Sequence, residues 1–264
     1  MNKQLLNGID HVYLAPKKDE AFSLYELFVK TFKLPVAWKF RDYKKFGSGA
    51  AYFGNLSIEV LKLESDFGDY SKTANFGIAF EPSCKTDLLI TELEERGINY
   101  RKPELFKIGF WKIAKKMWTT TMLSDLLSSQ HDQVFFCEYH GIDIQKYQSK
   151  FRKKLIEDSG GSLGIIKVSH VFVTLKDYEQ KIKLWNQTLS PFELSGTKSY
   201  TFYNGPKLTV QQGENDQLKA IAIKVVSKKY SEEFLRKSEI KYEIKNNAIY
   251  IDKTITGNVR FILY

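Results

Sequence analysis

The chain has 264 residues, of which 43% are hydrophobic and 27% are charged. These proportions are typical of a folded globular protein, and they exclude a disordered or fibrous chain. The length predicts one large domain or two smaller ones.

Lysine and arginine exceed aspartate and glutamate by 40 to 31, which gives a net charge of +9. The lysines occur as scattered pairs and not as one basic block, so the charge does not favour a nucleic-acid partner. A solvated basic surface is the first interpretation. A basic pocket mouth that attracts a small anionic ligand is the second.

The sequence also bears on location. The only two cysteines, Cys84 and Cys137, cannot form a disulfide framework. No apolar stretch approaches the ~18 residues of a membrane-spanning helix, and the first eight residues lack the apolar core of a signal peptide. We therefore expect a cytoplasmic protein that does not cross a membrane.

The predicted elements repeat in a fixed order along the chain. The first unit is a strand, a helix and three strands, at 8–14, 20–32, 35–40, 49–54 and 56–63, with a Gly54-Asn55 turn between the last two. The second unit follows the same order, at 75–81, 85–96, 98–101, 111–122 and 133–139. The pattern of 111–122 fits either a strand or a helix.

A small polar segment at 158–162 is interpreted as a linker. The order then returns twice more. The third unit has elements at 165–174, 177–189, 199–203 and 208–212, and the fourth at 218–226, 231–237, 242–244, 248–252 and 259–264. We predict an α+β protein with two duplicated halves, residues 1–158 and 163–264, each built from two βαβββ units.

Four segments carry a resemblance to a known family. They are the Gly-Ile-Asp-His-Val of 8–12, the run 49–59, the pair 76–82 and 97–100, and the Phe-Phe-Cys-Glu-Tyr of 135–139. In this order they resemble the vicinal oxygen chelate superfamily, which includes glyoxalases, extradiol dioxygenases and bleomycin-resistance proteins. The resemblance implies that each pair of units closes into a cup-shaped half-barrel. It also implies a divalent metal, bound by the first and last strands of each unit.

Carried over position by position, the resemblance makes His11, Glu59 and Glu138 the metal ligands, while the fourth position falls at Gly77. Three ligands leave open positions for substrate. Imidazole with carboxylates suits Fe, Mn, Zn, Ni or Co. Glu59 or Glu138 is also a candidate catalytic base. The set has only one histidine, which departs from the 2-His-1-carboxylate pattern and weakens a dioxygenase assignment.

In the second half, the same positions fall at His170, at Gln211 or Gln212, and near Ile223 and Leu263. Two apolar residues make this a poor metal site. We therefore expect the second half to shape the cup or to mediate packing.

Trp38, Arg41, Tyr52 and Tyr139 lie on strands beside the proposed ligands. They predict a substrate pocket with an aromatic wall and one basic group, which suits a planar or anionic small molecule. The alternative for each residue is core packing or simple surface exposure.

The leading interpretation is a metal-dependent enzyme whose substrate chelates the ion through adjacent oxygen atoms. Isomerase, lyase and dioxygenase chemistry all remain open. The alternative is a metal-free small-molecule binding protein of the bleomycin-resistance type. A monomer and a homodimer are both compatible with four units in one chain.

Overall fold

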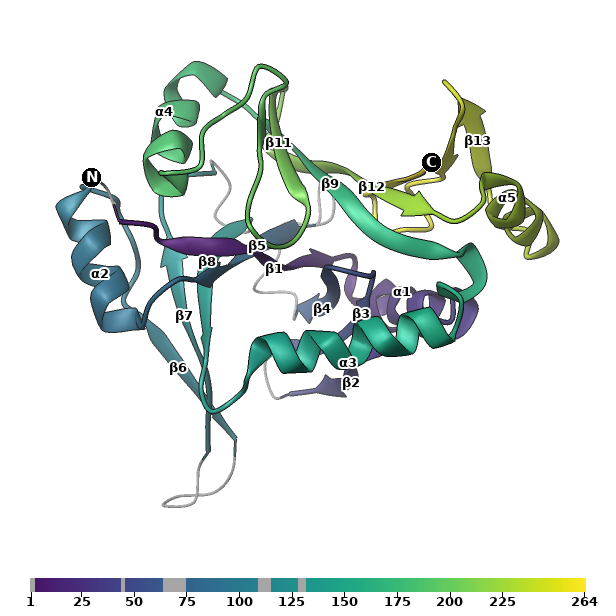
Figure 1. The fold of residues 1–264 in the computed structure, drawn as a ribbon, viewed down its shortest axis with the longest axis horizontal. Coiled ribbons are helices and arrows are strands. Elements are labelled where there is room, and N and C mark those ends of the chain that lie inside the picture. The colour runs from purple at the N-terminus through teal and green to yellow at the C-terminus, as the bar shows by residue number, and fades with distance from the viewer. Residues whose placement is uncertain (1–2, 44–45, 64–74, 109–114, 128–131) are drawn as a thin grey trace.

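The computed structural model describes residues 3–43, 46–63, 75–108, 115–127 and 132–264, and two mixed β-sheets form its framework (Figure 1). The first sheet has the strand order β2-β3-β4-β1-β5-β8-β7-β6. Its strands are β1 (Leu6–Ala15), β2 (Val36–Asp42), β3 (Phe46–Tyr52), β4 (Ser57–Leu63), β5 (Asn75–Pro82), β6 (Glu104–Ile108), β7 (Lys115–Leu123) and β8 (Gln133–Tyr139).

The second sheet has the order β10-β11-β9-β12-β15-β14-β13. Its strands are β9 (Ile165–Leu175), β10 (Ser199–Tyr200), β11 (Lys207–Gln212), β12 (Gln217–Val225), β13 (Tyr242–Lys245), β14 (Ala248–Ile251) and β15 (Arg260–Leu263). The helices are α1 (Ala21–Glu26), which continues as a π-helical turn, α2 (Thr86–Glu95), α3 (Ile144–Glu157), α4 (Tyr178–Leu189) and α5 (Lys228–Lys237). Helix α3 connects the two halves (Figure 1).

The strand orders reveal the internal duplication. In the first sheet, β2-β3-β4-β1 is mirrored by β6-β7-β8-β5, and β1 and β5 pair antiparallel at the centre. The second sheet repeats this plan around β9 and β12, which are also antiparallel. The predicted α+β fold with two paired half-barrels is therefore confirmed. The third unit has two strands after its helix, where the other units have three.

Three sequence predictions are refined by the structure. The ambiguous segment 111–122 is a strand where it is described, because β7 begins at Lys115, and residues 111–114 lie outside the described part. Of the expected strand 98–101, only Tyr100 forms a bridge, to Leu123. The predicted linker is packed tightly, since the backbone N–H of Ser162 donates to the carbonyl of Phe32 at 2.8 Å.

A hydrophobic core is shared by both halves. The ring centroids of Phe28 and Phe261 lie 5.7 Å apart. The fully buried Trp185 donates its indole N–H to the carbonyl of Leu126 at 3.1 Å. Burying such large aromatic side chains contributes strongly to stability, so these contacts hold the second half against the first.

The alternation of side chains gives the first sheet two different faces. On β1 and β4, Val12 and Ile58 point into the shared core. On the opposite face, Tyr13, Phe135 and Cys137 form a separate buried cluster. We call this opposite face the first cup.

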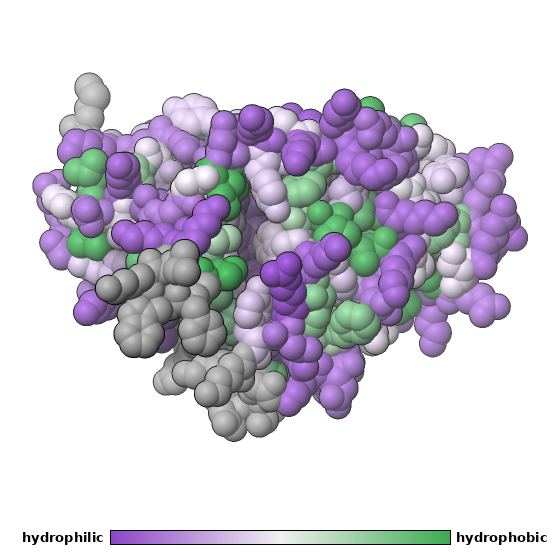
Figure 2. Space-filling view, turned by 90° about the horizontal axis from the view of Figure 1, so that it is seen from below, coloured by the Kyte–Doolittle hydropathy of each residue, from purple (hydrophilic) through white to green (hydrophobic). Residues whose placement is uncertain are grey.

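Within the described residues, no helix is long and apolar enough to span a membrane. Figure 2 shows one face of the molecule, where hydrophilic residues cover most of the surface and hydrophobic residues gather toward its middle.

Candidate active site in the first cup

A β-bulge on β1 brings two adjacent polar residues to the first cup. From Ile9 to His11 the chain of β1 advances by two residues, while the paired strand β5 advances by only one. Asp10 is therefore the extra residue of β1. Neighbouring residues of a regular strand would face opposite sides, but a bulge removes this restriction. Both side chains are buried, and Nδ1 of His11 lies 2.6 Å from Oδ2 of Asp10.

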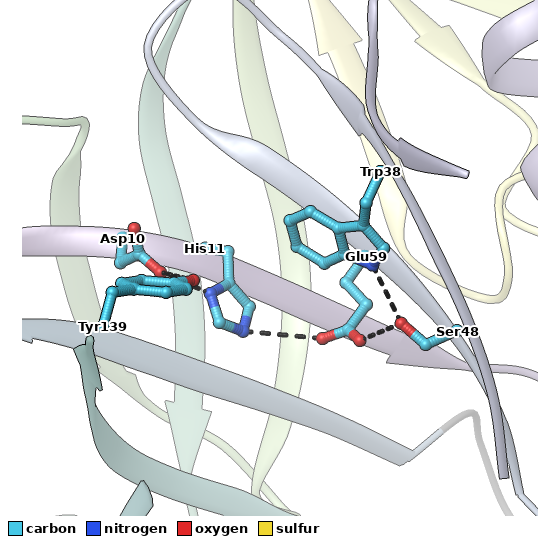
Figure 3. Close-up of polar contacts among 6 residues, drawn as sticks. All are labelled: Asp10, His11, Trp38, Ser48, Glu59 and Tyr139. Atoms are coloured by element: carbon cyan, nitrogen blue, oxygen red, sulfur yellow. Dashed lines mark hydrogen bonds and ion pairs between the residues drawn. The ribbon is translucent and has the colours of Figure 1, made fainter. Parts of the chain in front are cut away.

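Strand β8 contributes a second contact to the same carboxylate. The hydroxyl of Tyr139 donates to Oδ2 of Asp10 at 2.8 Å (Figure 3). Burial raises the pKa of Tyr139 well above its ordinary value, and the Asp10 charge adds to this effect. The phenol therefore remains a hydrogen-bond donor at neutral pH, and Asp10 is held from two sides.

On the other side of His11, three residues from β2, β3 and β4 form a second chain of contacts. The indole N–H of Trp38 donates to Oγ of Ser48 at 2.9 Å, and the Ser48 hydroxyl donates to Oε1 of Glu59. Oε2 of Glu59 lies 3.5 Å from Nε2 of His11 (Figure 3). The Trp38 ring meets the imidazole edge to face, with centroids 5.9 Å apart.

The two chains of contacts meet at the pair His11–Glu59. A carboxylate can only accept, so Nδ1 of His11 is the donor to Asp10. In the neutral imidazole this leaves Nε2 with its lone pair directed toward the Glu59 carboxylate. Two electron-rich atoms in a buried site repel each other unless a proton or a cation lies between them.

The pKa values of both groups reflect this arrangement. Burial alone would lower the pKa of His11, but the hydrogen bond and charge of Asp10 and the charge of Glu59 outweigh it, so the pKa is raised. Burial raises the pKa of Glu59, although His11 and Ser48 oppose the shift. Both shifts favour retention of a proton in the pair.

Glu138 does not join this group. Residues Phe135, Cys137 and Tyr139 of β8 face the first cup, so Glu138 points to the other face of the sheet. There its Oε2 accepts from the backbone N–H of Thr86 at 2.8 Å and from the Thr86 hydroxyl at 2.5 Å. Glu138 therefore caps the first turn of α2, where the helix dipole favours a negative charge.

The position that the resemblance assigned to Gly77 is filled by a neighbour. A Cβ at Gly77 would lie 2.0 Å from Cε1 of Tyr13, which pairs with Gly77 across the two strands. The Tyr13 ring therefore occupies the space that a fourth side chain would need.

The four predicted pocket residues have different surroundings. Trp38 and Tyr139 contact the site directly, as described above. Tyr52 is fully buried, and its ring centroid lies 5.6 Å from that of Phe151 on α3. Arg41 is exposed on the edge strand β2, and among the described residues no hydrogen bond or ion pair joins it to the site.

The second half repeats part of this arrangement. Oγ of Ser169 lies 3.1 Å from Nδ1 of His170. Ser169 therefore occupies the place beside His170 that Asp10 occupies beside His11. By strand pairing, Thr209 stands opposite Phe172 as Glu59 stands opposite Tyr13, so the equivalent of Glu59 is Thr209 and not Gln211. Burial and the charge of Lys207 lower the pKa of His170. The positive charge of Lys207 also disfavours a cation bound beside this imidazole.

Within the described part of the chain, no group of three or more His, Cys, Asp or Glu side chains is arranged to hold a metal. The site offers two ligand atoms, Nε2 of His11 and Oε2 of Glu59. Metal–ligand bonds of about 2.0–2.2 Å place two ligands of one ion roughly 3 to 3.5 Å apart, so the observed 3.5 Å fits a shared ion. Asp10 and Ser48 supply the outer hydrogen bonds that ligating side chains ordinarily have.

Two residues of the site were not singled out from the sequence. Asp10 was part of the quoted motif, but regular alternation would turn it away from His11, and the bulge carries no sequence signal. Ser48 lies between two glycines of β3, and nothing in its neighbours marks it as a partner of Glu59.

No family model matches the chain, and no curated protein matches its sequence significantly. Solved structures do match. An extradiol ring-cleaving dioxygenase from Brevibacterium fuscum is 15% identical with a TM-score of 0.59, over 99% of this chain and 72% of that one. Homoprotocatechuate 2,3-dioxygenase from Arthrobacter globiformis is 14% identical, with a TM-score of 0.58, over 99% and 80%.

A hypothetical protein from Staphylococcus aureus is 13% identical with a TM-score of 0.62, and the match covers 97% of this chain and 98% of that one. At these identities the likeness extends to the fold and no further. The chain therefore has the paired half-barrel fold of the extradiol dioxygenases, which are members of the vicinal oxygen chelate fold.

Proposed function

We propose that the half spanning residues 1–158 is a divalent-metal-dependent enzyme of the dioxygenase type, with His11 and Glu59 as its protein ligands. The substrate is a small molecule that reaches the ion through adjacent oxygen atoms. One structural neighbour was solved in complex with 3,4-dihydroxyphenylacetate, a substrate of this chemical class.

One observation carries the proposal. Nε2 of His11 and Oε2 of Glu59 point toward each other at 3.5 Å, while Asp10 and Ser48 hold their remaining polar atoms. The acidic and basic side chains that meet at His11 are the carboxylates of Asp10 and Glu59 and the imidazole itself, and they are buried or nearly so. A cation therefore complements the site, and the expected anionic substrate would bind only together with that cation.

The bound ion would supply Lewis-acid stabilisation of an oxyanion on the substrate. The protein residues have separate tasks. Asp10 keeps the proton on Nδ1 of His11 and so directs Nε2 into the cup, while Tyr139 holds Asp10 in place. Glu59 lies at the centre of the site, so its carboxylate could also accept a substrate proton. Trp38 and Phe135 pack against the imidazole and limit the entry of water.

A metal-free binding protein is the second candidate. It is favoured by the capping role of Glu138 and by the Tyr13 ring beside Gly77, which leave two of the four family positions without a ligand. In that case the buried carboxylates would contact a cationic or hydrogen-bond-donating ligand.

Calorimetric titration with Mn²⁺ distinguishes the two candidates. The enzyme proposal predicts one ion per chain and release of a proton, because the ion replaces the proton between His11 and Glu59. His11→Ala and Glu59→Ala remove a ligand and should each weaken binding by more than ~100-fold, since even outer-shell partners cost about 10- to 100-fold.

Glu138→Gln is the matched control, because it alters a carboxylate of the same sheet that faces α2. It should leave the Mn²⁺ affinity unchanged. Absence of Mn²⁺ binding in the unaltered protein, or equal binding in His11→Ala, would reject the metal site and favour the binding protein.

A further inference from the structure

A second concavity lies where the two halves meet, and none of its lining residues belongs to the first cup. It is a half-open groove of about 870 Å³. Its walls come from the β3–β4 turn, the end of α3, the start of β9, the loop at 203–205 and the start of α5. We call it the junction groove.

Exposed hydrophobic side chains gather at the junction groove. Five of the large hydrophobic residues that the fold leaves exposed line it, namely Ile156, Ile166, Tyr203, Val226 and Tyr230. Ile156, Tyr203 and Val226 are 71%, 71% and 72% exposed. Single exposed hydrophobics are ordinary, but a group of them around one concavity is typical of a binding surface.

The charges of the junction groove have one sign. Arg152 and Lys167 line it, and no aspartate or glutamate does so among the described residues. The ion pairs of the described residues include neither cation, although Arg152 lies close enough to the Tyr52 hydroxyl to oppose the rise in the pKa of Tyr52 that burial causes. Asn55, Asn204 and Ser227 add polar atoms to the walls. The groove therefore complements a ligand that has an apolar body and a negative group.

We propose that the junction groove binds a small amphipathic carboxylate. The carboxylate pairs with Arg152, whose planar guanidinium matches it geometrically, and Lys167 adds a second positive charge. The apolar body covers Ile156, Val226 and the tyrosine rings. The volume is within the usual range for a small-molecule site, about 300–1,000 Å³.

Helix α3 gives this site a connection to the first cup. Arg152 and Ile156 line the junction groove, while Phe151 of the same helix packs on the buried Tyr52 of β3. The hydroxyl of Tyr147 also donates to the carbonyl of Ala37 on β2 at 2.8 Å. A ligand in the groove therefore contacts the helix that packs on the strands carrying Trp38 and Ser48.

The test uses sodium decanoate as the probe and isothermal titration calorimetry on the full chain. Saturable binding of one equivalent is expected. Arg152→Gln and Ile156→Asp should each weaken it by about tenfold or more, since they remove the charged partner or place a repelling charge in the apolar wall. Decanol, which has the same chain without the charge, should bind at least tenfold more weakly.

Lys153→Gln is the matched control, because Lys153 directly follows Arg152 on the same helical turn, has a side chain that is 80% exposed, and pairs with Glu157 outside the groove. It should change the affinity less than twofold. Circular dichroism of each variant checks that the fold is kept.

Several outcomes would overturn the proposal. They are the absence of saturable decanoate binding, equal affinity for decanol, and binding that His11→Ala abolishes while Arg152→Gln does not. Sedimentation velocity tests one further outcome that would overturn it. If the protein forms a dimer that Ile156→Asp disrupts, the groove is an interface between two copies of this chain and not a small-molecule site.

Discussion

Nδ1 of His11 lies 2.6 Å from Oδ2 of Asp10, although the two residues are neighbours on one strand. A bulge in β1 makes this contact possible, and it determines which imidazole nitrogen faces Glu59. The proposed chemistry of the first cup therefore depends on Asp10 as much as on the two candidate ligands.

Asp10→Asn should lower the pKa of His11. In the unaltered protein the pKa lies above the ordinary value of 6.5, because Asp10 and Glu59 outweigh the effect of burial. Without the Asp10 charge, the effect of burial, which lowers the pKa of His11, is opposed less strongly. An NMR titration of the His11 ring in metal-free buffer measures both values. An unchanged midpoint in Asp10→Asn would mean that Asp10 does not control this imidazole.

The raised pKa of His11 also makes stability depend on pH. The folded protein binds this proton more tightly than the unfolded chain, whose pKa is about 6.5. The stabilisation is therefore fully present below about pH 6.5 and is lost as the pH rises through the higher folded-state pKa. The pKa of Glu59 is also raised, so this residue likewise makes the protein less stable as the pH rises, but over a lower pH range.

Urea unfolding with and without His11→Gln measures this contribution, because groups that do not interact with His11 titrate alike in both proteins. The difference in unfolding free energy between the two should fall between pH 6 and pH 9 in metal-free buffer. A difference that stays constant or grows over this range would contradict the raised pKa.

Glu138→Ala should destabilise the protein without affecting the first cup. It removes the acceptor for the backbone N–H and the hydroxyl of Thr86, and loss of a helix cap costs about 1 kcal/mol. Urea unfolding measures this cost, and Glu157→Ala is the control for loss of an exposed carboxylate. If Glu138→Ala weakened Mn²⁺ binding instead, Glu138 would have to face the cup.

Gly77→Ala should be destabilising by about 1–3 kcal/mol, because the added methyl group would overlap the Tyr13 ring. The double variant with Tyr13→Ala should lose less stability than the sum of the two single changes, since the clash is then absent. Thermal unfolding of the four proteins measures this coupling. Strict additivity would mean that the two side chains do not compete for one space.

The repeat pattern predicted the order of strands and helices, because hydrophobic periodicity is a property of the sequence alone. The closure of each pair of units into a half-barrel was implied by the family resemblance. The same resemblance placed His11 and Glu59 at one site, and in the structure their Nε2 and Oε2 atoms lie 3.5 Å apart.

The remaining site residues depend on features that periodicity does not contain. A shift of one residue in the assumed register of β8 exchanges the faces of Glu138 and Tyr139. The bulge that turns Asp10 toward His11 comes from pairing with β5, which is distant in sequence. Arg41 is exposed because β2 is an edge strand, and this too is a matter of tertiary arrangement.

The metal content of the protein tests the central claim most directly. Elemental mass spectrometry should be applied to protein purified without an affinity tag or chelator, before and after incubation with Mn²⁺ or Fe²⁺. The account predicts close to one divalent ion per chain after incubation, retained in Glu138→Gln and lost in His11→Ala. No ion in the unaltered protein, or an equal amount in His11→Ala, would contradict it.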